Sequence, residues 1–186
     1  MQEYKREYHL FSLCGLNCGL CPMFHTDAKS KCPGCGGTDF SYKHPTCAIV
    51  TCSKKHGNVE YCFECNCYPC ERYTKQNNKD SFITYKNVKS DIEKARKNGI
   101  EKYKAELNEK VEILNFLMSN YNDGRRKNFY CLAVNLLKLK DLRSILKNFN
   151  KRIVQKDINS KEKIELLVTL FKDKAKVNNI EFKLRK

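Results

Sequence analysis

Apolar residues recur at intervals of three and four in the second half of the chain. The longest series is Ile100, Tyr103, Leu107, Val111, Leu114, Met118 and Tyr121. Such spacing places all seven side chains on one face of a long helix. The tripeptide Asn122-Asp123-Gly124 follows at once and is typical of a turn. We therefore predict a helix over residues 100–121 that ends at this turn.

Three shorter helices are predicted beyond the turn, which makes about four in all. Their apolar positions are, in chain order, Phe129, Leu132, Ala133, Leu136 and Leu137; Leu142, Ile145, Leu146 and Phe149; and Ile164, Leu167, Leu170, Phe171 and Ala175. Asp141 and Ser160 precede the last two series and are side chains that favour the N-cap position. The pattern indicates a C-terminal helical bundle.

Two short segments near the ends of the chain have a different pattern. Residues 180–184 alternate apolar and polar side chains, which is typical of a half-buried strand. Residues 9–13 could supply a partner strand from the other end. The sequence thus predicts a small strand pair beside the helices.

The N-terminal third has too few apolar residues to form an ordinary core. Residues 14–70 contain eleven of the twelve cysteines, all four prolines and six of the eight glycines, but only nine large aliphatic, Phe or Met residues. Burial of so little apolar surface does not offset the entropy of ordering the chain. A structural zinc ion contributes on the order of 10–16 kcal/mol, against about 2–4 kcal/mol for a disulfide. Metal ions could therefore fold this segment.

The cysteine spacing is typical of metal knuckles. A C-x2-C pair places two thiolates on one tight turn, where both can bind one ion at about 2.3 Å. Pro22 and the Pro33-Gly34 pair supply residues that such turns favour. The predicted metal ligands are Cys14, Cys18, Cys21, Cys32, Cys35, Cys47, Cys52, Cys62, Cys65 and Cys70, with His44 and Cys67 as further candidates.

The ligands can be grouped in more than one way. The simplest grouping assigns one zinc ion to Cys18, Cys21, Cys32 and Cys35 and a second ion to Cys47, Cys52, Cys62 and Cys65. The remaining candidates, Cys14, Cys67, Cys70 and His44, would complete a third site or exchange into the first two. His25 and His56 also lie in this segment, where a surface or hydrogen-bonding role is the alternative to ligation.

The type of cofactor depends on the compartment. The polar N-terminus does not resemble a secretory signal, and no apolar stretch approaches the length of a membrane span. We therefore expect a cytoplasmic protein without membrane contact, in which reduced thiols bind metal rather than form disulfides. An iron–sulfur cluster is the alternative cofactor. Cys14-x3-Cys18-x2-Cys21 also matches the cluster motif of radical S-adenosylmethionine enzymes, although Leu20 stands where they usually have an aromatic residue.

The formal net charge of +15 raises the question of nucleic-acid binding. Each zinc ion bound by four thiolates adds a charge of −2, so two sites would lower the total by about four. Of the 36 basic residues 28 are Lys, and Lys lacks the bidentate geometry of Arg. The composition favours weak nucleic-acid or anion binding at most.

Two candidates lie outside the cysteine-rich segment. Arg125, Arg126 and Lys127 precede a predicted helix, whose N-terminus could bind an anion. Cys131 is the lone distal cysteine, either a packed thiol or a reactive one activated by these basic residues. No paired carboxylates, glycine-rich phosphate loop or Ser/His/Asp order accompanies them.

The sequence resembles a known family. In the cysteine-rich segment the resemblance rests on Cys14-Gly15-x2-Cys18-x2-Cys21-Pro22, Cys32-x-Gly34-Cys35, Cys47-x4-Cys52-Ser53 and Gly57-x-Val59-Glu60-Tyr61-Cys62-x2-Cys65-x2-Tyr68-Pro69-Cys70-Glu71. Residues 80–84, 121–127 and 129–137 extend it into the helical half. The chain is similar to the domain-of-unknown-function family numbered 3795, in which an acidic residue is usual where Cys67 stands here. The resemblance implies a zinc-binding bacterial or archaeal protein and implies no reaction.

These observations lead to one overall prediction. We expect an α+β protein in which residues 1–75 form an irregular cysteine-rich metal module with short strands, packed on a helical domain of residues 76–186. Its predicted role is structural zinc binding, with the module presenting a surface to an unidentified protein partner. The alternatives are an enzyme or redox protein that uses an iron–sulfur centre or Cys131, and weak nucleic-acid binding. The absence of a catalytic constellation favours the non-enzymatic interpretation.

Overall fold

The chain divides into two compact units. The computed structural model describes residues 4–44, 46–74, 79–155 and 158–186. The first unit comprises Met1–Leu107 with Leu184–Lys186, and the second comprises Asn108–Lys183. The division falls inside one helix, α5 (Ile100–Tyr121). The predicted domain boundary between residues 75 and 76 lies outside the described residues and stays a prediction.

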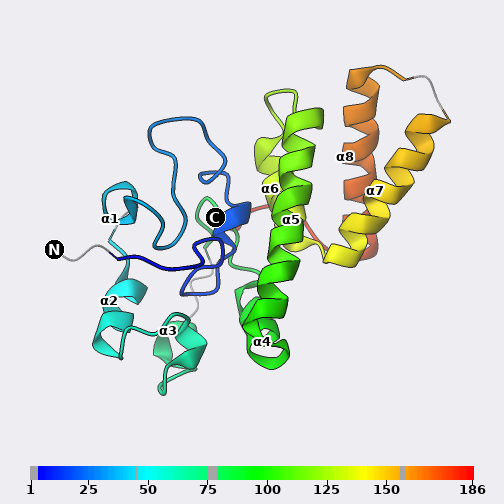
Figure 1. The fold of residues 1–186 in the computed structure, drawn as a ribbon. Helices are drawn as coiled ribbons and strands as arrows, with labels where there is room; N and C mark the ends of the chain where they lie inside the picture. The colour runs from blue at the N-terminus through cyan, green and yellow to red at the C-terminus, as the bar shows by residue number, and fades with distance from the viewer. Residues whose placement is uncertain (1–3, 45, 75–78, 156–157) are drawn as a thin grey trace. The chain divides into compact units, whose positions relative to one another are not determined.

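Short helices joined by irregular segments make up most of the first unit (Figure 1). They are η1 (Cys18–Leu20), α1 (Phe40–Lys43), α2 (Ala48–Lys55), η2 (Cys62–Glu64), α3 (Glu71–Thr74) and α4 (Val88–Asn98), where η denotes a 3₁₀ helix. The N-terminal part of α5 follows α4 after Gly99, whose φ is +90°. Helices α2 and α4 were not predicted from the sequence.

Aromatic rings from several segments form the core of the first unit. The ring of Phe11, which is fully buried, lies 5.6 Å from the ring of Tyr61 and 4.6 Å from that of Tyr103. A second buried cluster consists of Tyr4, Leu13, Cys35, Phe40 and Val50. The cysteine-rich segment therefore packs against residues that precede and follow it in the chain, which add to its limited apolar surface.

The loop between the first two cysteines is anchored to α4 and α5. The Asn17 side chain donates to the Asp91 carboxylate at 2.9 Å and accepts from the Tyr103 hydroxyl at 2.8 Å. Gly15 has a φ of +89°, and a Cβ atom at this position would lie 2.5 Å from Ile92. Only glycine tolerates both the backbone conformation and the close approach to α4.

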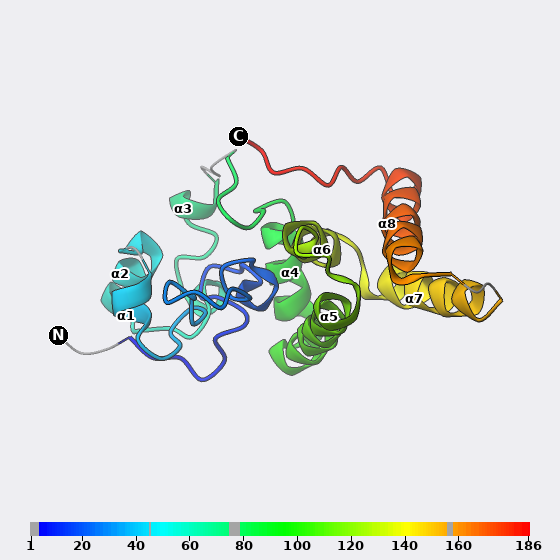
Figure 2. The same cartoon turned by 90° about the horizontal axis from the view of Figure 1, so that it is seen from above.

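The second unit is a bundle of helices (Figure 2). It contains the remainder of α5 with α6 (Lys127–Leu136), α7 (Leu139–Val154) and α8 (Ser160–Val177), and α7 packs against α8. Its buried side chains include Leu114, Leu117, Tyr130, Leu137, Leu142, Phe149, Leu167 and Phe171. Each helix of the described ranges is either too short or too polar to span a lipid bilayer.

The boundaries of these helices follow local capping interactions. The side chain of Asn122 accepts from the backbone amides of Gly124 and Arg126, which forms the predicted turn after α5. Asn159, rather than the predicted Ser160, caps α8 and forms a capping box with Glu162. Asp141 is also not an N-cap, because α7 begins two residues earlier at Leu139 and Asp141 lies in its first turn.

The predicted α+β class is wrong, because the described residues form helices and irregular segments without any strand. In the segment predicted as the first strand, His9 accepts from the amide of Cys35 and Leu10 from that of Gly19, so its carbonyl groups serve separate loops. In the C-terminal tail, the amide of Arg185 donates to the Asp80 side chain at 2.8 Å. Side chains and loops thus take the hydrogen bonds that a sheet would use.

Candidate metal centre

All twelve cysteines lie in the described part of the chain, and all are free thiols. Eleven belong to the first unit, whereas Cys131 lies in α6 of the second. Cys35 and Cys131 are buried and Cys67 is exposed, and the other nine are partly buried. The eleven cysteines of the first unit therefore form no disulfides with one another, and all but Cys67 are at least partly buried.

Four cysteines and one histidine line a small cavity, here called the cysteine cavity. Its volume is about 30 Å³, roughly the share of one water molecule in the liquid. The potential ligands on its wall are Cys52, His56, Cys62, Cys65 and Cys70, and apolar and aromatic side chains, among them Ile49, Val59, Tyr68 and Tyr73, complete it. Side chains with soft sulfur and imidazole groups therefore lie around one small space.

Local backbone structure brings these donors to the cavity. Cys52 lies on α2, and His56, four residues later, is the C-cap of that helix. The imidazole Nδ1 of His56 lies 3.7 Å from the Cys52 sulfur. η2 brings Cys62 and Cys65 onto one turn, closed by a 3.2 Å hydrogen bond from the Cys65 amide to the Cys62 carbonyl. Cys70 directly precedes α3.

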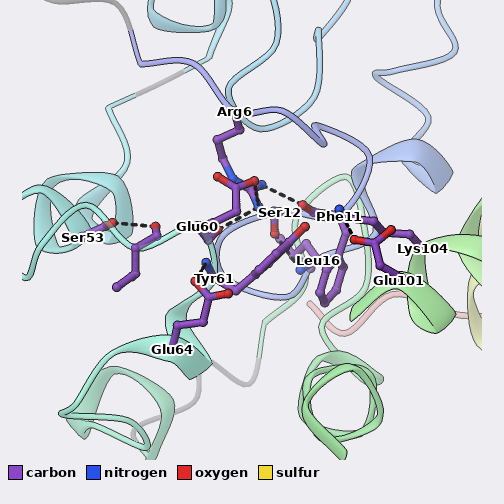
Figure 3. A network of polar contacts seen from close by, with 11 residues as sticks. Arg6, Phe11, Ser12, Leu16, Ser53, Glu60, Tyr61, Glu64, Glu101 and Lys104 are labelled. Carbon is purple, nitrogen blue, oxygen red and sulfur yellow. Dashed lines mark hydrogen bonds and ion pairs between the residues drawn. The ribbon is translucent and has the colours of Figure 1, made fainter. Parts of the chain in front are cut away.

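A buried arginine, Arg6, contacts the segment that precedes Cys62 (Figure 3). The Arg6 guanidinium donates to the carbonyl groups of Phe11 at 2.7 Å and Glu60 at 2.8 Å, and pairs with the Glu60 carboxylate at 3.0 Å. It also lies 4.9 Å from the centre of the Tyr61 ring. The backbone just before Cys62 is thereby fixed from several sides.

A second group of thiols, here called the inner thiols, consists of Cys14, Cys18, Cys35 and Cys47. Cys35 belongs to the buried cluster, and Cys18 and Cys47 pack against that cluster. Burial raises the pKa of Cys14 to about 11, the Ser12 hydroxyl opposes this, and Cys35 and Cys47 raise it further. Burial also raises the pKa of Cys18, with smaller contributions from Cys35 and Cys14. These four thiols are thus near enough to influence one another.

Cys21 and Cys32 form a third neighbourhood. The turn after Cys21 is closed by a 3.0 Å hydrogen bond from the Phe24 amide to the Cys21 carbonyl. Burial raises the pKa of Cys21, whereas backbone hydrogen bonds from Met23 and Phe24 lower it. The Cys32 amide donates to the Met23 carbonyl at 2.9 Å, which holds Cys32 beside this turn. Amide donors directed at a sulfur atom favour its thiolate form.

The predicted grouping of ligands is only partly reflected in these neighbourhoods. Three members of the predicted second site, Cys52, Cys62 and Cys65, line the cysteine cavity, with Cys70 in place of Cys47. Within the ranges that the structure describes, no three His, Cys, Asp or Glu side chains converge closely enough to form a metal site. The ligand groups therefore stay predictions, although the donor chemistry of the cavity suits zinc.

The two further candidates differ in their surroundings. His44 follows α1 as its C-cap residue, and its ring stacks on that of Phe40 with the ring centres 4.6 Å apart. Cys67 is exposed and lies near Cys65, whose charge raises the Cys67 pKa. His56, which the cysteine spacing does not single out, has its imidazole 3.7 Å from the Cys52 sulfur. Its position four residues after Cys52 becomes informative only if that segment is helical.

The distal candidates lie in the second unit. Asp123 accepts from the amide of Arg125 and pairs with the Arg126 guanidinium at 3.2 Å, so a carboxylate already lies at the N-terminal end of α6. Cys131 is only 1% exposed. This burial agrees with the packed alternative for Cys131, and the anion site stays a prediction.

Comparisons with known proteins place the cysteine-rich part of the chain in a family. Residues 10–75 match the family model described as "Protein of unknown function (DUF3795)". The match contains all eleven clustered cysteines, and the resembling segments of the helical half lie outside it. Neither the comparison with curated proteins nor that with solved structures found a match. The chain therefore carries, over residues 10–75, a domain of the DUF3795 family.

Proposed function

We propose that the first unit binds structural zinc through its clustered cysteines. The observation that supports this most strongly is the cysteine cavity, where four free thiols and one imidazole line about 30 Å³. Thiolate and imidazole are the donors of structural zinc sites in proteins. A zinc ion there would neutralise thiolate charges that otherwise repel one another.

The proposed ligands of the cavity are Cys52, Cys62, Cys65 and Cys70. His56 would either replace one thiolate or hydrogen-bond to the Cys52 sulfur. The inner thiols would hold a second ion, in competition with the grouping of Cys18, Cys21, Cys32 and Cys35 that the spacing favours. We therefore expect two zinc ions per chain, or three if Cys21 and Cys32 recruit further donors.

The proposed role of zinc is structural rather than catalytic. Four protein donors leave no open position for a water molecule, which a catalytic zinc ion requires. The ions would join segments that otherwise share little apolar surface and so stabilise the module as a surface for a protein partner. Iron–sulfur clusters use the same thiolates, so metal identity is the first test.

Metal content after anaerobic purification tests the proposal directly. We expect two to three zinc ions per chain by elemental analysis and a colourless protein. If the protein is brown and contains iron and acid-labile sulfide, its cofactor is an iron–sulfur centre rather than zinc. A fully folded protein with neither metal would contradict the proposal as a whole.

Matched cysteine variants then test the location. We expect Cys62→Ser to lower the zinc content by about one ion per chain, because the cavity loses one of its thiolates. Cys131→Ala serves as the control, since it also removes one cysteine but lies in the second unit. Equal zinc content in wild type and Cys62→Ser would exclude the cysteine cavity as a site.

A further inference from the structure

A second and larger hollow lies in the first unit, here called the α4 hollow. Its volume is about 330 Å³, which falls in the range of small-molecule binding pockets. The residues that line it are Tyr68, Pro69, Tyr73, Lys89, Glu93 and Arg96. None of them is a predicted metal ligand, so the proposed function leaves this hollow without a role.

Two tyrosine rings form one wall of the α4 hollow. The rings of Tyr68 and Tyr73 pack edge to face, with their centres 5.0 Å apart. Tyr73 is only 7% exposed, so its ring is held in place by the surrounding core. A preformed aromatic wall with Pro69 beside it suits the flat, apolar part of a ligand.

The rest of the lining comes from one face of α4. Lys89, Glu93 and Arg96 are spaced by four and three residues, so their side chains lie on the same side of the helix. The Glu93 carboxylate pairs with Arg96 at 3.3 Å and with Lys97 at 3.5 Å. Its negative charge is therefore already balanced by two cations.

Lys89 gives the α4 hollow an excess of positive charge. Unlike Arg96 and Lys97, it has no carboxylate partner within the described part of the chain. An ammonium group that lines a hollow attracts anions rather than cations or neutral polar molecules. Arg96 adds a planar group with several donors, which suits carboxylate or phosphate oxygens.

We propose that the α4 hollow binds a small organic anion that carries its charge on a flat ring system. The carboxylate or phosphate group lies against Lys89 and Arg96, and the ring lies along Tyr68 and Tyr73. Aryl carboxylates and nucleoside monophosphates share this chemistry. The site needs no metal ion as a ligand, although it shares Tyr68 and Tyr73 with the cysteine cavity.

Titration of the full-length protein, with the metal as purified, tests this site. The probes are 4-hydroxybenzoate, adenosine monophosphate and inorganic phosphate, and binding is followed by calorimetry and by shifts of the tyrosine ring signals in NMR spectra. We expect one or both ring-bearing probes to bind at least tenfold more tightly than phosphate. The probe that binds more tightly shows whether the hollow prefers an aryl carboxylate or a nucleoside monophosphate. No saturable binding of either ring-bearing probe at millimolar concentration would overturn the proposal.

Two lysine variants locate the binding site. We expect Lys89→Gln to weaken binding of the ring-bearing probe about tenfold, while Lys97→Gln leaves it within about twofold. Both residues are exposed lysines of α4, and only Lys89 lines the hollow, so the pair controls for loss of one charge from the helix. Equal binding by wild type and Lys89→Gln, or phosphate binding as tight as that of the ring-bearing probes, would contradict the proposal.

Discussion

The carboxylate of Asp80 binds both the backbone and the side chain of Arg185. Its Oδ2 accepts from the Arg185 amide at 2.8 Å, and its Oδ1 accepts from the guanidinium Nη2 at 2.7 Å. The Asp80 amide in turn donates to the Arg185 carbonyl at 2.9 Å. Because the Asp80 side chain is 0% exposed, this contact is shielded from solvent on the carboxylate side. It attaches the C-terminal residues to the first unit.

This contact predicts a pH-dependent loss of stability. Burial alone raises the pKa of Asp80, but hydrogen bonds from Arg185 and from the Tyr85 amide outweigh it and hold the pKa at about 2, below the ordinary 3.8. A lowered pKa stabilises the fold above the ordinary value, and the effect disappears as the pH falls from about 4 to about 2. We expect Asp80→Asn to lower the free energy of unfolding by about 1–2 kcal/mol near neutral pH.

Urea denaturation at neutral pH and near pH 2 measures this difference. Wild type and Asp80→Asn should converge in stability at the acidic end. Combining Asp80→Asn with Arg185→Gln should cost less than the sum of the two single changes, because they share one contact. Additive costs would show that the two side chains do not interact in solution.

Two glycines with similar φ angles predict different costs of substitution. Gly15 and Gly99 have φ values of +89° and +90°, so alanine is strained at both positions. A Cβ atom at Gly15 would also lie 2.5 Å from Ile92, whereas one at Gly99 would have open space around it within the described part of the chain. We expect Gly15→Ala to be less stable than Gly99→Ala by about 1–3 kcal/mol in chemical denaturation. Equal losses would mean that Ile92 moves aside without cost.

The buried Arg6 predicts a large effect from a single change. Arg6→Gln removes bonds to two carbonyl groups and one carboxylate, and the Arg6 side chain is only 1% exposed. We expect a loss of about 3 kcal/mol in the free energy of unfolding. The exposed pair of Arg143 and Glu109 has shorter contacts of 2.6 Å, yet Arg143→Gln should cost less than about 1 kcal/mol because water screens the pair. A larger loss for Arg143→Gln than for Arg6→Gln would contradict the burial of the Arg6 side chain.

Thiol modification separates Cys67 from the proposed ligands. Cys67 is exposed, and the other clustered cysteines are buried or partly buried. With zinc bound, brief alkylation followed by peptide mass spectrometry should modify Cys67 first. A zinc chelator should then expose the remaining clustered thiols, while Cys131 stays protected in the second unit. Modification at Cys67 that is as slow as at Cys62 would instead include Cys67 among the ligands.

The helices of the second unit could be predicted because their apolar residues follow one period over several turns. In α5 this pattern continues from Ile100 to Tyr121, and the structure has the helix over that range. The tail after α8 could not be predicted in the same way. Its alternating side chains resemble a strand over five residues, but the chain there binds Asp80, more than 100 positions away in the sequence.

The cysteine-rich segment was less predictable for a related reason. Spacing alone identifies turns such as Cys62-x2-Cys65, which the structure closes with a backbone hydrogen bond. It does not identify α2, whose eight residues include only two large apolar side chains, Ile49 and Val50. The neighbourhood of Cys52 and His56 depends on that helix, so the spacing could not single out His56. Which thiols meet depends on tertiary contacts that leave no periodic signal.

Tyr68 and Tyr73 line both the cysteine cavity and the α4 hollow. A metal ion in the cavity would restrict the same two rings that an organic anion must contact. If ordering by one ligand lowers the cost of binding the other, thermodynamic reciprocity requires each to raise the affinity of the other by an equal factor. The zinc affinity of the module would then rise with the concentration of the anion, and the fraction of the protein that holds zinc would depend on that concentration.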